Sequence, residues 1–81
     1  MDDPTAQTLM GCFEKVFPDL PRSAIPSAAH TNLPGWDSLA QVTLLSLVGE
    51  EFALDIDFEE MEGATSFAAL LELVRAKLAG R

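Results

Sequence analysis

The chain has 81 residues and carries 13 acidic against 5 basic side chains, for a formal net charge of −8. This length predicts one small domain, 1–81, with a single modest core. Nucleic acid and anionic membranes are excluded as expected partners, because both require clustered Lys and Arg. The charge favours partners that carry basic patches. One cysteine allows no internal disulfide and indicates no metal site.

The beginning of the chain reads Met-Asp-Asp-Pro and lacks the positive and apolar segments of a secretory signal. The apolar run 38–49 is shorter than the roughly 20 residues that span a bilayer. We therefore expect a cytoplasmic monomer.

Apolar residues at helical spacing predict three long amphipathic helices. Their ranges are about 4–17, 38–52 and 66–79. Asp3 is expected to cap the first helix and Pro4 to occupy its first turn. The proline-rich segment 18–36 is expected to be a long loop that Leu20, Ile25 and Leu33 hold against the core.

The second helix has an expected apolar stripe that faces the core. Its members are Leu39, Val42, Leu45, Val48 and Phe52, widened by Leu44 and Leu47. Gly49 lies inside this helix, where glycine costs about 1 kcal/mol relative to alanine. We interpret it as a tolerated surface glycine, with close approach of another helix or a ligand as the alternative.

A short helix is predicted at 58–61, because Asp57 and Glu60 have the spacing of a capping box. Thr65 or Ser66 is expected to cap the last helix. No segment shows the alternation of a strand. The predicted fold is therefore all-α, a small bundle of three long helices and one short helix.

Ser38 is the candidate site residue, because it stands where the longest helical pattern begins. Ser38 and Gln41 match a capping box, so an ordinary cap is one interpretation. Asp37 is an equally good cap, and would leave Ser38 as the first helical residue with its hydroxyl toward solvent. The helix dipole and the unpaired N–H groups at this end favour a phosphate group on that hydroxyl.

The order of motifs along the chain resembles the acyl carrier protein family. The residues that carry the resemblance are Gly35-x-Asp37-Ser38-Leu39, then Val42, Leu44 and Leu45, and the close Glu50-Glu51-Phe52. The first helix, the long loop, the turn at 57–62 and the Thr65-Ser66 start of the last helix agree with it. The resemblance covers essentially the whole chain and implies an acyl-carrier-like bundle.

The resemblance implies that Ser38 carries 4′-phosphopantetheine, transferred from coenzyme A by a separate phosphopantetheinyl transferase. It implies that Asp37 and Leu39 are recognised by that enzyme. The thiol of the arm would hold acyl groups as thioesters for loading and condensing enzymes. The chain itself would not be an enzyme, since it has one His, one Cys and no catalytic constellation.

Departures from the family pattern point to a specialised pathway. Ala40 and Thr43 stand where fatty-acid carriers usually present acids, and Trp36 before Asp37 resembles carriers of polyketide-type pathways. A peptidyl carrier with aminoacyl cargo is the alternative within the family. The alternative outside it is an unmodified acidic helical adaptor. The cargo, the pathway and the modification state are not given by the sequence.

Two further sets of residues are candidates for binding. Acidic side chains between Glu50 and Glu62 are expected to dock partners, with a merely solvated face as the alternative. The acids are Glu50, Glu51, Asp55, Asp57, Glu59, Glu60 and Glu62.

Trp36 is either an anchor of the loop or a partner contact. The family resemblance makes Val48, Phe52, Ile56 and Met61 candidates for an acyl pocket, although core packing is their first interpretation. His30 is given no role, and Cys12 is expected to pack in the core.

Overall fold

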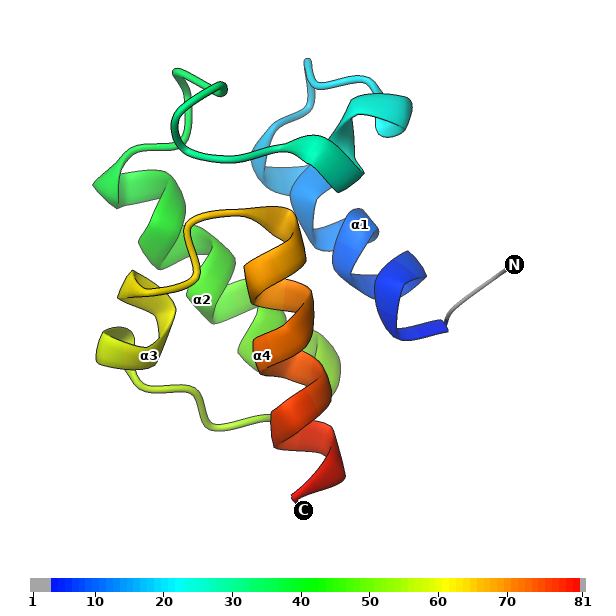
Figure 1. Cartoon of the computed structure of the whole chain (residues 1–81), viewed down its shortest axis with the longest axis vertical. Helices are drawn as coiled ribbons and strands as arrows, with labels where there is room; N and C mark the ends of the chain where they lie inside the picture. Colours follow the sequence, from blue (N-terminus) through cyan, green and yellow to red (C-terminus); the bar gives the residue numbers. More distant parts are fainter. Residues whose placement is uncertain (1–3, 81) are drawn as a thin grey trace.

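A computed structural model describes residues 4–80 of the chain (Figure 1). Its helices are α1 (Pro4–Val16), the 3-10 helix η1 (Arg22–Ser27), α2 (Ser38–Phe52), α3 (Phe58–Glu62) and α4 (Phe67–Ala79). Within this range there is no strand, only an isolated bridge between Ala29 and Ser66. The prediction of an all-α fold is confirmed. Asp3, the predicted first cap, lies outside the described residues.

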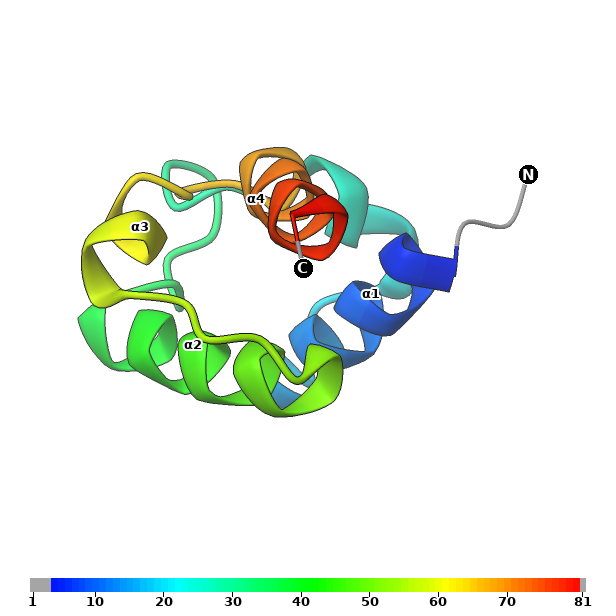
Figure 2. The same cartoon turned by 90° about the horizontal axis from the view of Figure 1, so that it is seen from below.

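The helices enclose one hydrophobic core, to which each of them contributes (Figure 2). Its completely buried large side chains are Leu9, Phe13, Ile25, Leu44, Val48, Met61, Leu70 and Val74. Viewed from below, α2 and α4 lie on opposite sides of the molecule, and α3 and α1 lie at its two ends (Figure 2). Burial of this continuous apolar surface is the main force that stabilises so small a domain.

The segment between α1 and α2 is more ordered than the expected loop. It forms η1, whose Ile25 is completely buried, and Leu20 and Leu33 pack partly against the core as predicted. Backbone bonds join the segment to the start of α4: the N–H of His30 donates to the carbonyl of Thr65 (2.9 Å), and that of Phe67 to Ala28 (2.9 Å). These bonds hold the loop against the α3–α4 connection.

The predicted apolar stripe of α2 is wrong at its beginning. Leu39 is 75% exposed and Val42 is 43% exposed, whereas Leu44 and Val48 are completely buried. The first turn of α2 lies at one end of the bundle, away from α1 (Figure 1), so its outer face has no helix to cover it. Phe58 is 46% exposed, because it begins α3 on the outside of the molecule.

Helix α2 ends in a Schellman motif that uses Ala53 in the left-handed conformation, at φ 53°. The N–H of Leu54 donates to the carbonyl of Gly49 (3.0 Å), and that of Ala53 to Glu50 (3.4 Å). A Cβ on Gly49 would lie only 3.2 Å from the Leu54 carbonyl oxygen. Gly49 is therefore not merely a tolerated surface glycine. The close approach comes from the chain's own reversal, rather than from another helix or a ligand.

Replacing Ala53 with Gly should stabilise the protein. A left-handed alanine costs about 1–2 kcal/mol, and the greater freedom of glycine in the unfolded chain offsets part of that gain. We expect a net increase of about 0.5–1 kcal/mol in the free energy of unfolding, measured by urea denaturation. The control is Ala76→Gly at an exposed position inside α4, which should lose about 1 kcal/mol. Equal losses in both variants would contradict the assigned cap.

Candidate functional site

The start of α2 decides between the two interpretations of Ser38. Asp37 adopts an extended conformation, and its Oδ1 accepts a hydrogen bond from the N–H of Ala40 (2.9 Å). Asp37 is thus the N-cap, and Ser38 is the first residue of the helix. The capping box that the sequence allowed between Ser38 and Gln41 does not form. The carboxylate of Asp37 caps the helix instead.

The hydroxyl of Ser38 is consequently accessible. The side chain is exposed, and it makes no hydrogen bond to any residue within 4–80. It stands in the first turn of α2, where backbone N–H groups lack helical acceptors and the dipole favours negative charge. The chemistry that this position can support is the attachment of an anionic group.

Trp36 fixes the segment that leads into this turn. Its ring packs edge-on against Phe13 of α1, with 5.3 Å between centroids, and lies 5.9 Å from Phe17. Phe13 in turn packs against Phe67 of α4 at 5.2 Å. The side chain of Trp36 is only 6% exposed. This burial supports the interpretation of Trp36 as a loop anchor.

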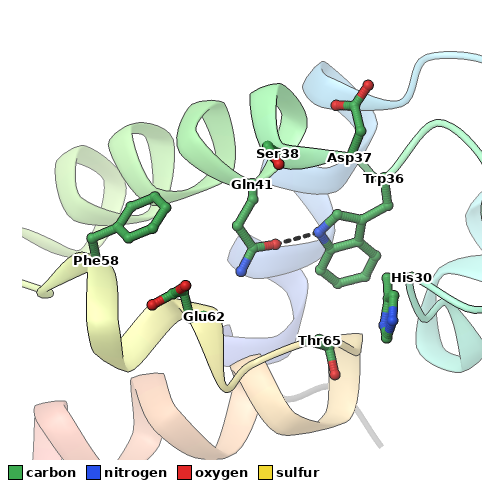
Figure 3. Close-up of a pocket in the computed structure, with 8 residues that line it drawn as sticks. All are labelled: His30, Trp36, Asp37, Ser38, Gln41, Phe58, Glu62 and Thr65. Atoms are coloured by element: carbon green, nitrogen blue, oxygen red, sulfur yellow. Dashed lines mark hydrogen bonds between the residues drawn. The ribbon is translucent and has the colours of Figure 1, made fainter.

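A hollow of about 300 Å³ lies beside Ser38, between the first turn of α2 and the segment that contains α3 (Figure 3). Its lining residues are His30, Trp36, Asp37, Ser38, Gln41, Phe58, Glu62 and Thr65. The carboxamide of Gln41 accepts a hydrogen bond from the indole Nε1 of Trp36 and donates one to the backbone carbonyl of Met61. Gln41 thereby joins α2, the preceding loop and α3 in one network.

Reasoning from the sequence assigned no functional role to Gln41, His30 or Thr65. Ser38-x-x-Gln41 suggested only a cap, which concealed a side chain that reaches across to α3. The backbone bond between His30 and Thr65 brings two polar residues from distant segments to one edge of the hollow. No local sequence pattern predicts this contact, because it depends on how the loop crosses the start of α4.

The proposed acidic docking segment is exposed, but neighbouring helices neutralise part of it. Lys15 of α1 lies 3.3 Å from a carboxylate oxygen of Glu51, and Lys77 of α4 lies 2.8 Å from Glu60. The hydrogen bond from Lys77, aided by the backbone N–H of Asp57, lowers the pKa of Glu60. The other members, Glu50, Asp55, Asp57, Glu59 and Glu62, are exposed. Their exposure leaves partner docking and simple solvation both open.

The candidates for an acyl pocket belong to the packed interior. Val48 and Met61 are completely buried, Ile56 is 8% exposed, and Phe52 is partly buried. None of them lines the hollow beside Ser38. Access to these four side chains would require α3 or its connections to move.

Within residues 4–80, no group of His, Cys, Asp and Glu side chains is arranged to hold a metal ion. In the same range, none of the helices combines the length and apolar character needed to cross a membrane. Comparison with protein-family models, with curated proteins and with solved structures found no match to the chain.

Cys12 is placed where the sequence predicted it, in the core, with a side chain that is 1% exposed. Burial, and secondarily the carboxylate of Glu51, raise the thiol pKa from 9.0 to about 11, against the opposing effect of Lys15. A thiol held in its neutral form is a poor nucleophile. We assign Cys12 a packing role.

This shift predicts a pH dependence of stability. As the pH rises above about 9, the thiol ionises first in the unfolded chain, so the folded state loses stability until the pH exceeds about 11. The melting temperature of the wild type should therefore fall relative to that of Cys12→Ala between these pH values. The Ala variant controls for titrating lysines. A constant difference between the two proteins would contradict the raised pKa.

Proposed function

We propose that the protein is a carrier that holds acyl intermediates on a 4′-phosphopantetheine arm attached to Ser38. The observation that carries the proposal is the exposed Ser38 hydroxyl in the first turn of α2, beside a cap supplied by Asp37. The resemblance of the chain's motifs to the acyl carrier protein family supplies the identity of the attached group. A polyketide-type or other specialised acyl pathway is the proposed setting.

The residues around Ser38 suit this attachment. The hydroxyl would lose its proton, and its oxygen would become the ester oxygen of a phosphodiester while the pyrophosphate bond of coenzyme A breaks and adenosine 3′,5′-bisphosphate leaves. The first turn of α2 would favour the remaining negative charge. Because Asp37 already caps the helix, esterifying Ser38 removes no bond that α2 needs. The thiol of the attached arm would supply the thioester chemistry. The proposed transferase would recognise the exposed Asp37 and Leu39 beside the hydroxyl.

Incubation with coenzyme A, magnesium and a broad-specificity phosphopantetheinyl transferase should add one arm, which peptide mass spectrometry should map to Ser38. Ser38→Ala should abolish the addition and keep its helical circular dichroism, since Asp37 still caps α2. The matched control is Ser46→Ala, an exposed serine of the same helix, which should be modified like the wild type. Addition to the Ser38→Ala variant would refute the assignment.

The two alternatives give different results in related experiments. A peptidyl carrier accepts the same arm, but an amino-acid-activating enzyme then loads it. An unmodified acidic adaptor shows no mass change with coenzyme A and the transferase. We favour the acyl carrier because Gly35 stands alone before the motif, whereas peptidyl carriers more often show two glycines there.

Partners are proposed to dock on the acids around α3. Exposed charges interact over about 10 Å at 0.1 M salt, so association with a cognate condensing enzyme should slow as salt is added. Reversing Glu59 and Glu62 to Lys should weaken that association more than reversing Asp19 and Glu72, an exposed pair outside the segment. Both double variants change the net charge equally. Equal association rates, measured by surface plasmon resonance, would show that only total charge matters.

A further inference from the structure

The Gln41 side chain forms a polar connection from α2 to α3. It lies one turn after Ser38 on the face that borders the hollow, and it points between Trp36 and the segment carrying Glu62 (Figure 3). Its two hydrogen bonds end on well-fixed groups. Trp36 is 6% exposed, and Met61, whose carbonyl accepts the second bond, is completely buried.

Helix α3 depends on such contacts, because five residues are far too few to be helical alone. Two further contacts attach it to the rest of the fold, the buried side chain of Met61 and the ion pair of Glu60 with Lys77, while the capping box of Asp57 and Glu60 stabilises its first turn locally. That ion pair is partly exposed and therefore weak. The hydrogen bond from Gln41 to the Met61 carbonyl is the contact that holds α3 on the side of the hollow.

Gln41 lies at the hollow, and the core begins one turn further along α2. Leu44 and Val48 follow Gln41 at helical spacing and are completely buried in the cluster that contains Met61. With α3 held in place, a group that enters the hollow meets the Gln41 carboxamide and the side chains of Glu62 and Thr65. It lies beside the rings of Phe58 and Trp36, and it does not reach Leu44 or Val48 in the core. If α3 were released, an apolar chain could reach Leu44 and Val48.

We infer that Gln41 is a latch that holds α3 over the core and so keeps long apolar groups on an arm at Ser38 out of that core. The inference rests on the proposed function and deepens it. A cargo on the arm would stay outside the core whatever its chain length, which suits short or polar acyl groups. Gln41 is a positioning residue in this account and takes no part in chemistry.

The latch is tested first without any arm. Gln41→Ala removes both bonds, and Gln41→Glu keeps an acceptor for the Trp36 N–H but removes the donor to Met61. Amide hydrogen exchange of α3 should become about fivefold faster in both variants, the effect of losing one hydrogen bond. The fluorescence of Trp36, the only tryptophan, should shift only in Gln41→Ala. Gln7→Ala, which removes a bond to Arg22 elsewhere, should leave both readouts unchanged.

The second test measures cargo. Acetyl and octanoyl arms are transferred to Ser38 from the corresponding acyl-coenzyme A, and thioester hydrolysis is followed by mass spectrometry. In the wild type both should hydrolyse at equal rates. In Gln41→Ala, the octanoyl thioester should hydrolyse about fivefold more slowly than the acetyl one, because its chain gains access to the core.

Unchanged α3 exchange in Gln41→Ala would overturn the latch. Protection of the octanoyl thioester in the wild type, or no effect of chain length in Gln41→Ala, would overturn its effect on cargo. If Ser38 accepts no arm at all, the proposed function fails and the effect on cargo fails with it. The exchange measurements would still decide whether Gln41 holds α3.

Discussion

The packing of Trp36 against Phe13 is the contact on which the candidate site depends. It joins α1 to the segment before α2, and through Phe13 it also reaches Phe67 at the start of α4. Because the indole is buried, the next residues cannot turn inward. Asp37 and Ser38 are displayed at the surface, and Leu39 follows them there. A core interaction thereby determines which side chains of the first turn remain accessible.

Hydrogen bonds also connect Trp36 to the five-residue helix α3. The indole N–H of Trp36 bonds to Gln41, and Gln41 bonds to Met61. Two side chains, from the loop and from α2, are thereby connected to the backbone of α3 beside the hollow. The Gln41 carboxamide can form both hydrogen bonds only when Trp36 and α3 are in this one arrangement. The two bonds therefore specify the relative positions of these elements as well as stabilising them.

The positions of the four α-helices could be predicted because local signals mark them. These signals are the spacing of apolar residues and the carboxylate of Asp57 before α3, although α3 also needs contacts with α2 and α4 to remain helical. Helix η1 was missed because prolines and short polar residues dominate its segment, and its order comes from burying Ile25 and from backbone bonds to α4. The exposure of Leu39 and Val42 was missed because periodicity cannot tell where a bundle ends.

Some residues of the candidate site could likewise be recognised from the sequence, and others could not. Asp37 and Ser38 were both recognised from the sequence, but only the backbone geometry decides which of them caps α2. The roles of Lys15 and Lys77 beside the acidic segment could not be foreseen, because each base comes from a helix distant in the sequence. Gln41 was hidden for the same reason, since its partner Met61 lies on another element.

The proposed attachment of a carrier arm to Ser38 can be tested by tandem mass spectrometry of the intact protein isolated from its natural source. We expect a molecule heavier by one phosphopantetheine group, which fragments with release of that group and leaves dehydroalanine at position 38. An intact mass equal to that of the unmodified chain, found in cells whose other carrier proteins are modified, would contradict the attachment.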